Sequence, residues 1–553
     1  MRNSLNLQPE NVFYFFEELC KIPHGSGNTK AISDYCVDFA KEHQLEYHQD
    51  SLNNVIIIKD ATPGYENADP VIIQGHLDMV CEKEEDCTID FMKDGLDLYV
   101  DEDFLRARGT TLGGDDGIAI AFALAILEDD TLKHPRLEMI FTIDEETGMD
   151  GVQGIDLTPI KGNIMLNIDS DEEGVFLTSC AGGLGVQIDL PVSRQEATGT
   201  SILFKLTGLF GGHSGGEIHK ERGNSNILMG RVLKYMADEF EFSISMLEGG
   251  SKDNAITRQT ITEIIIDPAD LEGFKNRLSQ IEQILQNEYK TADPDLHFEL
   301  EVAENQTRNI LNSISFTKVL FLLREAPYGV AHMSVDIPNL VETSDNTGVM
   351  KLGEEEFNLH FSIRSSVSSR KYEVADRVQF LGEFLGATVT TGSDYPAWEY
   401  KKDSKVRDVI SGLYHDLFQE EAVVGAIHAG LECGYFAGKM PELDAVSFGP
   451  KNLDIHTPQE RLSISSTEKY WKLLTADKFL ASCLGMTRTE AKKAIRQKRF
   501  SSDSGIIRDS DEKIEGTLQY FFDNRPIQYE EFSYYLFHKP AGCVSATKDN
   551  LHQ

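Results

Sequence analysis

The sequence lacks any uncharged apolar run that could cross a bilayer, since a membrane-spanning helix needs about 18–20 consecutive apolar residues. It also lacks the apolar core of a secretory signal, because Glu17 and Glu18 interrupt the apolar residues near the N-terminus. Neither a membrane anchor nor export is indicated. We therefore expect a cytoplasmic protein without a membrane partner.

The cysteines form no closely spaced pair, so the CxxC motifs of structural zinc and redox sites are missing. Eight scattered cysteines fit reduced thiols better than a disulfide framework, which agrees with the expected cytoplasmic location. Internal repeats and low-complexity tracts are also missing. The composition is that of ordinary globular domains.

Basic residues are few, with 52 Lys and Arg against 91 Asp and Glu, and the net charge is −39. Such acidity argues against nucleic-acid binding over most of the molecule. The excess of acidic residues is not spread evenly along the chain. Residues 477–553 hold 12 basic and 11 acidic residues and are nearly neutral. This change of composition indicates a seam close to residue 476.

A chain of 553 residues is too long for one core, and it predicts two to four domains at roughly one per 100–200 residues. Over residues 1–182, apolar strand patterns alternate with helical ones, after an amphipathic helix that begins near Pro9. Strands buried on both faces and separated by helices predict an α/β domain, with a sheet flanked by helices. In such domains ligands bind beyond the carboxyl ends of the strands.

The pattern changes near Gly182 to alternating strands with helices between them, which predicts an inserted α+β domain over residues 183–391. The strand and helix rhythm then resumes over residues 392–475. We interpret residues 1–182 and 392–475 as one catalytic domain that the insertion interrupts, and residues 476–553 as an appended tail.

The run PVIIQGHLDMV breaks into glycine, histidine and aspartate where its strand ends, so His76 and Asp78 lie on the same face. Alone, this pair is weak evidence for a metal site. Four further acidic or histidine sites also stand at the ends of apolar runs or in glycine-rich turns. They are Asp115 with Asp116, Glu145 with Glu146, Asp169, and His456.

This set suits metal chemistry, because zinc accepts imidazole nitrogen and carboxylate oxygen. A two-metal hydrolase also needs a bridging carboxylate to hold the ions ~3.5–4 Å apart. Three carboxylates and a bridging hydroxide would balance the charge of two Zn²⁺ ions, which favours a nucleophilic hydroxide near neutral pH. Of the adjacent glutamates, one can bind metal while the other acts as general base.

The motifs HLD, LGGDDG, DEETG, NIDS and SFGPKNLDIHTPQE, in this order, resemble the zinc peptidase family that includes carnosinases, carboxypeptidase G and tripeptidase T. More narrowly, GGHSGGEIHKERGNSN, GGSKDNAITR and AIHAGLECGYFAGK resemble its aminoacyl-histidine (Xaa-His) dipeptidase branch. The likeness covers about residues 1–475. It implies a dizinc catalytic domain interrupted by a lid domain.

The resemblance implies a role for each residue of the set. His76 and Asp169 would bind one zinc, Glu146 and His456 the other, and Asp115 would bridge the two ions. Asp78 would orient His76. Glu145 would be the general base and later protonate the leaving amine. In this family, aspartate at the position of Asp169 is typical of aminopeptidases and dipeptidases.

The resemblance also assigns residues of the insertion and of the segment after it. His213 would donate to the developing oxyanion, either in a partner subunit's site or on closure of the lid, and the lid would form a homodimer. Substrate-binding roles would fall to His219, Arg222, Asn224, Arg364, His428 and Glu432. Asp116 stands where relatives of this type often carry asparagine.

Residues 476–500 place six basic residues within twelve positions, at helical spacing. With NRPIQYEEFSYYLFHKPAGC, this tail resembles the front of ribosomal small-subunit pseudouridine synthases: a small RNA-binding module followed by the first synthase strand. Because the catalytic aspartate of such enzymes has no counterpart here, we expect no synthase activity. Weak RNA contact by the tail stays open.

We predict metal-dependent hydrolysis of dipeptides, Xaa-His such as β-alanyl-histidine among them. The cofactor would be two zinc ions, although Co²⁺ and Mn²⁺ accept the same ligands. One alternative is another amide hydrolase of the same family, such as an aminoacylase or deacetylase. The other is an RNA-binding fusion in which the tail sets the biological role.

Overall fold

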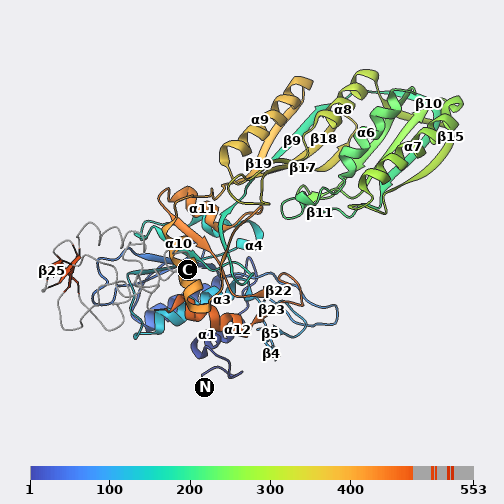
Figure 1. Cartoon of the computed structure of the whole chain (residues 1–553). Helices are drawn as coiled ribbons and strands as arrows, with labels where there is room; N and C mark the ends of the chain where they lie inside the picture. Colours follow the sequence, from blue (N-terminus) through green and yellow to red (C-terminus); the bar gives the residue numbers. More distant parts are fainter. Residues whose placement is uncertain (1, 477–499, 503–504, 507–519, 523–524, 528–553) are drawn as a thin grey trace, which may run out of the picture. The chain divides into compact units, whose positions relative to one another are not determined.

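The computed structural model describes residues 2–476 and four short segments, 500–502, 505–506, 520–522 and 525–527 (Figure 1). The chain divides into two compact units. The first consists of Met1–Thr178, Lys401–Gly425 and the chain from Lys439 onward, and the second of Ser179–Tyr400 and Ala426–Gly438. Among the described helices, none is both long and apolar enough to span a membrane.

The first unit is built on an eight-stranded mixed sheet, in the order β1-β2-β6-β3-β7-β21-β8-β20. The run β6-β3-β7-β21 is parallel, and the strands β2, β3 and β6 consist almost entirely of buried residues. The predicted α/β class is therefore confirmed. The strands are β1 (Glu46–Gln49), β2 (Val55–Lys59), β3 (Val71–His76), β6 (Leu137–Thr142), β7 (Ile164–Asn167), β8 (Val175–Cys180), β20 (Val423–Ile427) and β21 (Asp444–Ser447).

Helix α3 (Gly114–Glu128) is almost fully buried, which explains why its sequence is apolar all round rather than amphipathic. Helix α1 (Glu10–Cys20) packs against it, and a Cβ on Gly117 would lie 3.3 Å from the Phe16 ring. Pro9 precedes α1, as expected for a proline at a helix start. The unit also contains α2 (Lys30–Glu42), α4 (Glu145–Gly148), α5 (Asp150–Gly154), α10 (Lys405–Phe418) and α12 (Ile464–Leu474).

Three parallel strands end at one edge of this sheet, where the predicted ligands follow. His76 is the last residue of β3 and pairs in register with Thr142, the last residue of β6. Strand β7 pairs with β3 up to Asn167, two residues before Asp169. Because parallel strands share one carboxyl edge, the fold brings polar residues from three separate sequence segments together.

The second unit is built on a nine-stranded sheet, in the order β15-β10-β14-β12-β17-β18-β9-β19 with β16 beside β17. The neighbouring strands of this sheet pair antiparallel. The strands are β9 (Gly182–Pro191), β10 (Arg194–Thr207), β12 (Phe242–Gly249), β14 (Thr260–Ile266), β15 (His297–Leu311), β16 (Gly329–Met333), β17 (Val341–Leu352), β18 (Glu356–Ser365) and β19 (Thr388–Tyr395).

Helices α6 (Ser225–Ala237), α7 (Leu271–Tyr289), α8 (Ser313–Glu325) and α9 (Ser368–Leu385) belong to this unit, along with the short helices η1 (Ile218–Lys220) and η2 (Pro268–Asp270). Their buried apolar residues and those of the sheet form one core. Helix α11 (Glu432–Lys439) begins in Ala426–Gly438, which groups with this unit. The sequence pattern instead predicts this segment as part of residues 392–475 of the catalytic domain.

Small sheets complete the described chain. One has the order β22-β23-β5-β4, one pairs β11 with β13, and one in the tail has the order β25-β24-β26-β27. The predicted tail helix and the synthase-like strand YYLFHKP lie outside the described residues. The strands are β4 (Leu98–Asp101), β5 (Phe104–Ala107), β11 (Gly212–His213), β13 (Ala255–Ile256), β22 (Asn452–Leu453), β23 (Arg461–Ser463), β24 (Phe500–Ser502), β25 (Gly505–Ile506), β26 (Tyr520–Phe522) and β27 (Arg525–Ile527).

Candidate metal centre

His76 is buried, and its two ring nitrogens face different partners. Nδ1 lies 2.9 Å from the backbone oxygen of Asp78, which requires a proton on Nδ1. Nε2 faces the carboxylates of Asp115, at 3.1 Å, and Asp169, at 3.8 Å. The strand end therefore fixes the tautomer that leaves Nε2 free to bind a cation.

The carboxylate of Asp78 links His76 to the turn of the two glutamates. Its Oδ1 lies 3.5 Å from Nδ1 of His76 and accepts the backbone N–H of Glu145 at 3.1 Å. Its Oδ2 accepts the Ser26 hydroxyl at 2.7 Å and the backbone N–H of Glu146 at 3.4 Å. Burial opposes ionisation, but the hydrogen bonds from His76 and Ser26 hold the pKa of Asp78 below its usual value.

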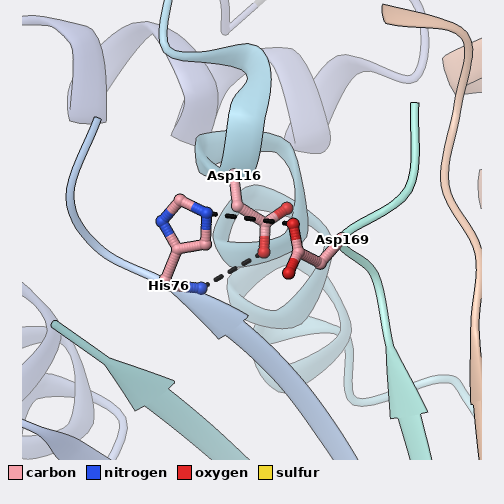
Figure 2. A group of neighbouring side chains, drawn as sticks. All are labelled: His76, Asp116 and Asp169. Carbon is pink, nitrogen blue, oxygen red and sulfur yellow. Dashed lines mark hydrogen bonds and ion pairs between the residues drawn. The ribbon is translucent and has the colours of Figure 1, made fainter. Parts of the chain in front are cut away.

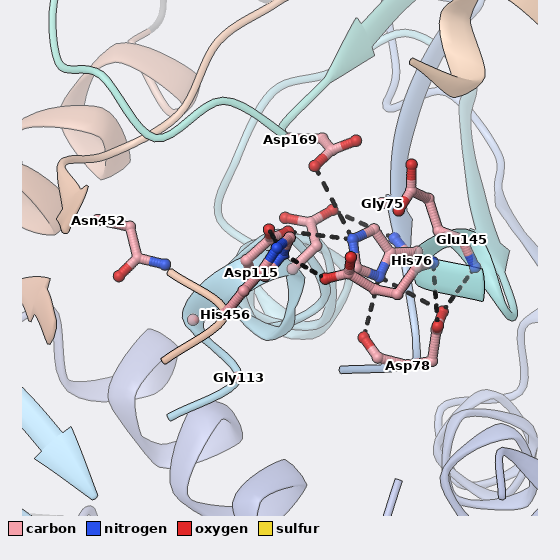
Figure 3. Close-up of polar contacts among 12 residues, drawn as sticks. Gly75, His76, Asp78, Gly113, Asp115, Glu145, Asp169, Asn452 and His456 are labelled. Carbon is pink, nitrogen blue, oxygen red and sulfur yellow. Dashed lines mark hydrogen bonds and ion pairs between the residues drawn. The ribbon is translucent and has the colours of Figure 1, made fainter. Parts of the chain in front are cut away.

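Asp115 lies between two imidazoles that are far apart in the sequence (Figure 3). Its Oδ1 is 3.1 Å from Nε2 of His76, and its Oδ2 is 3.2 Å from Nε2 of His456. Nε2 of His456 is also 2.9 Å from Oε1 of Glu146. The hydrogen bonds with Asp115 and Glu146 raise the pKa of His456 to about 10. A carboxylate with one oxygen toward each histidine has the arrangement of a bridging ligand.

Three overlapping groups bring possible ligand atoms within 4.8 Å of one another: His76 with Asp116 and Asp169, His76 with Glu145 and Glu146, and Asp115 with Glu146 and His456. All five predicted metal ligands therefore lie in one cluster, with Glu145 and Asp78 beside them. The first group is shown in Figure 2.

Asp116 belongs to the first group by distance, but one of its oxygens is already engaged. Oδ2 of Asp116 accepts the backbone N–H of His76 at 3.2 Å (Figure 2). Burial, followed by the charge of Asp116, raises the pKa of Asp169 well above its usual value. Because crowded, buried carboxylates repel one another, a bound cation would relieve this cost. The donor set therefore fits divalent metal ions.

His213 lies in the second unit, where two backbone amides determine its tautomer. Its Nδ1 accepts the N–H groups of Gly215, at 3.2 Å, and Gly216, at 3.1 Å. Nδ1 is thus unprotonated, and the ring proton stays on Nε2. Burial and the charge of Arg364 lower the pKa of His213, which favours this neutral form.

Arg364 and His428 are both buried in the second unit. Nη1 of Arg364 donates to the hydroxyl of Tyr395 at 2.8 Å, while its Nε has no hydrogen-bond partner within the described chain. Nε2 of His428 lies 2.7 Å from the hydroxyl of Ser344. Burial, and then the charge of Arg364, lowers the pKa of His428 to about 3, so this ring is neutral. Glu432 is also fully buried here.

The other predicted substrate residues have different surroundings. Arg222 forms an ion pair with Glu217 at 3.2 Å and donates to the backbone oxygen of Gly211. Asn224 is the N-cap of α6, and its amide group also donates to Thr347 O at 2.9 Å. His219 is exposed on η1. The side chains of Arg222 and Asn224 are therefore already engaged within their own unit.

Sequence reasoning missed three residues that shape the metal centre: Ser26, Asp116 as the acceptor for His76, and Glu460. Glu460 is 2% exposed and accepts the backbone N–H groups of residues 112–115. The sequence does contain a signal for Glu460, because it is the last residue of the motif SFGPKNLDIHTPQE and lies four residues after His456.

Comparison with known proteins agrees with this geometry. The model of the family described as peptidase family M20/M25/M40 matches residues 72–476. The cytosol non-specific dipeptidase of Escherichia coli (strain K12) is 37% identical over 471 residues, which cover 85% of this chain and 97% of that protein. The crystal structure of aminoacylhistidine dipeptidase from Vibrio alginolyticus superposes with a TM-score of 0.81 at 34% identity, covering 86% of this chain and 97% of that one.

A second, short match concerns a different protein. Ribosomal small subunit pseudouridine synthase A from Haemophilus influenzae is 34% identical over 74 residues, which cover 13% of this chain and 32% of that protein. Both resemblances noted in the sequence are therefore confirmed.

Proposed function

Since the chain belongs to peptidase family M20/M25/M40, we propose that it is a metallodipeptidase that hydrolyses unblocked dipeptides, Xaa-His among them. The observation that carries this proposal is the carboxylate of Asp115 between the imidazoles of His76 and His456. The names of the two similar dipeptidases support the substrate class. The proposed location is the cytoplasm, which the name of the Escherichia coli relative supports.

The proposed cofactor is a pair of zinc ions, for which Co²⁺ or Mn²⁺ could substitute. His76 and Asp169 would hold one ion, Glu146 and His456 the other, and Asp115 both. When bound, the ions would supply Lewis-acid polarisation of the peptide carbonyl and of the attacking water.

Glu145 is the proposed general base. Its backbone N–H donates to Asp78, so the turn that carries it is tied to the residue that orients His76. Its carboxylate would take a proton from the attacking water and return it to the leaving amine nitrogen as the C–N bond breaks. Glu146, one residue later, is 2.9 Å from His456 and would remain a metal ligand.

His213 and Arg364 are the proposed substrate contacts of the second unit. With Nδ1 accepting two amide hydrogens, His213 offers an Nε2–H donor that suits a developing oxyanion. Arg364 has an Nε–H without a partner in the described chain, and a guanidinium is well shaped for a substrate carboxylate. His428 and Glu432 would line the specificity pocket beside it.

Amidation of the substrate C-terminus should therefore abolish turnover or raise KM sharply, because it removes the carboxylate that Arg364 would bind. We would measure histidine release from β-alanyl-histidine and alanyl-histidine, and release of histidinamide from their amides, with metal content determined on the same sample.

A pentapeptide and an N-acetylated dipeptide are the matched controls for this panel. The proposal expects both to be poor substrates. Equal rates on a dipeptide, its amide and a pentapeptide would show an open-cleft aminopeptidase instead. Preference for the N-acetylated compound would favour the alternative of an aminoacylase or deacetylase.

The proposed homodimer would form through the second unit. Helices α8 and α9 expose large apolar side chains there, with Ile314 68%, Phe380 69% and Phe384 76% exposed, and Ile314 and Phe384 border one shallow groove. Phe384→Glu should therefore halve the mass measured by light scattering, because it places a charge in an apolar interface. Val335→Glu, at a 94% exposed residue elsewhere in the unit, is the matched control and should leave the mass unchanged. A wild-type monomer would contradict the proposal.

RNA binding by residues 476–553 is the alternative role, and the short match to a pseudouridine synthase is the observation in its favour. An electrophoretic mobility-shift assay of the full chain with ribosomal RNA tests it, using a variant with Lys492 and Lys493 changed to glutamate as the comparison. A shift lost in that variant would support the alternative.

A further inference from the structure

Glu460 occupies a pocket made of backbone amides. Its Oε2 accepts the N–H of Leu112 at 2.7 Å and of Gly113 at 3.0 Å. Its Oε1 accepts the N–H of Gly114 at 2.8 Å and, more weakly, of Asp115 at 3.3 Å. Nδ2 of Asn452 donates to Oε1 at 3.0 Å. Five N–H groups therefore point at one buried carboxylate.

The chain around Gly113 is shaped for this carboxylate. Gly113 has φ +70°, in the left-handed region, which turns successive N–H groups toward one point and forms an anion-binding nest. A Cβ on Gly114 would stand 2.8 Å from Nδ2 of Asn452 and 3.1 Å from Oε1 of Glu460. The glycines of LGGDDG thus admit the carboxylate at close range, just before Asp115.

Glu460 also lies on the segment that carries His456, four residues away. Asp115 and His456, two ligands of the proposed centre, are 341 residues apart in the sequence. The segments that carry them meet at the carboxylate of Glu460. Gly113 and Asp115 of the first segment, and Asn452 and His456 of the second, are labelled in Figure 3. Without Glu460, four amides would be left buried without an acceptor, and the two segments would lose this tie.

We propose that Glu460 is a positioning residue that sets the separation of Asp115 and His456 and so tunes metal affinity. This inference rests on the proposed metal centre. Residues that orient metal ligands typically change metal affinity by about 10–100-fold when they are replaced.

Glu138 provides a matched control for Glu460. It is a fully buried glutamate of the same unit that accepts the backbone N–H groups of Lys161 and Gly162 at 2.9–3.0 Å. Glu138 lies near the start of β6, whereas the proposed metal ligands lie at or beyond the carboxyl ends of the parallel strands. Glu138→Gln thus disturbs the same type of hydrogen bonding without touching the proposed centre.

The experiment titrates metal-free, full-length protein with Zn²⁺ against a chromophoric chelator. Glu460→Gln keeps the shape of the side chain but turns an NH₂ group toward amide donors, so we expect at least one of the two ions to bind ~10-fold or more weakly. Glu138→Gln should bind both ions as the wild type does. The unfolding temperature of the metal-free protein should fall in both variants, and Glu138→Gln also weakens the ion pair with Arg136.

Asn452→Ala is the second variant, because it removes one donor to Glu460 and leaves the backbone intact. It should weaken metal binding in the same direction by a smaller factor, and it decides the question if Glu460→Gln does not fold. If a folded Glu460→Gln protein binds Zn²⁺ with wild-type affinity, the inference is overturned. If Glu460→Gln does not fold, wild-type Zn²⁺ affinity in Asn452→Ala overturns it. A wild-type protein that binds no metal would instead refute the proposed function.

Discussion

Glu145→Gln is expected to keep both metal ions and to lose at least ~10²-fold in kcat, since general acid–base catalysis typically contributes 10²–10⁴-fold. The substitution removes the carboxylate that would accept the proton of the attacking water in the proposed mechanism. It leaves in place the hydrogen bond from the backbone N–H of residue 145 to Asp78, so the turn should not move. Steady-state rates on a dipeptide, together with metal analysis of the same protein, measure the effect.

Glu146→Gln is the matched variant, because it makes the same chemical change one residue later. Glu146 is 2.9 Å from His456, and its loss should reduce metal affinity first and the rate as a consequence. High metal concentration should then restore part of the Glu146→Gln activity and none of the Glu145→Gln activity. Near-normal turnover by Glu145→Gln would show that the base lies elsewhere, and the roles of the two glutamates would have to be reassigned.

The catalytic sheet could be predicted from the sequence because its central strands are apolar on both faces. The runs at β3, β6 and β7 stand out for that reason, and polar residues directly after such runs had to meet at one edge. His76 could be singled out in this way, since a histidine at the end of a buried strand is visible as a break in the pattern. The predicted ligand set rests on strand ends and glycine-rich turns, together with the family resemblance.

Contacts that depend on backbone groups could not be predicted in the same way. The motif LGGDDG does not reveal that its backbone amides converge on Glu460, because that contact joins segments almost 350 residues apart. The residue types of LGGDDG alone do not separate Asp116 from Asp115, and only the family resemblance pointed to Asp115 as the ligand. In the structure, Oδ2 of Asp116 accepts the backbone N–H of His76. Spacing identifies residue types that can bind metal, but the assignment of each oxygen needs the folded chain.

Asn224 shows the converse limit. The family motif around it pointed to a substrate contact, and in the structure its side chain caps α6 and bonds to Thr347. An N-cap asparagine followed by Ser225 and an apolar helix is a pattern that the sequence also contains. A polar residue in a family motif can therefore stabilise the fold instead of binding substrate. Measuring both the stability and the KM of a variant distinguishes the two roles.

Asp115→Asn should remove both metal ions and with them all measurable dipeptide hydrolysis. Each oxygen of Asp115 faces one histidine, at 3.1 Å and 3.2 Å, so this carboxylate is the group that both proposed ions would share. An amide keeps the shape but loses the negative charge and offers only one oxygen, which cannot bridge two cations. The measurements are metal content after dialysis and the rate of histidine release at saturating dipeptide.

Asp116→Asn is the control, since it makes the same change at the adjacent residue. The amide oxygen of asparagine can still accept the backbone N–H of His76, so that variant should retain both ions and keep its rate within ~10-fold of the wild type. The reverse result, with ions lost from Asp116→Asn and retained by Asp115→Asn, would make Asp116 the bridging ligand. The proposed centre would then be built around His76, Asp116 and Asp169, and the tie from Glu460 to Asp115 would no longer act on a metal ligand.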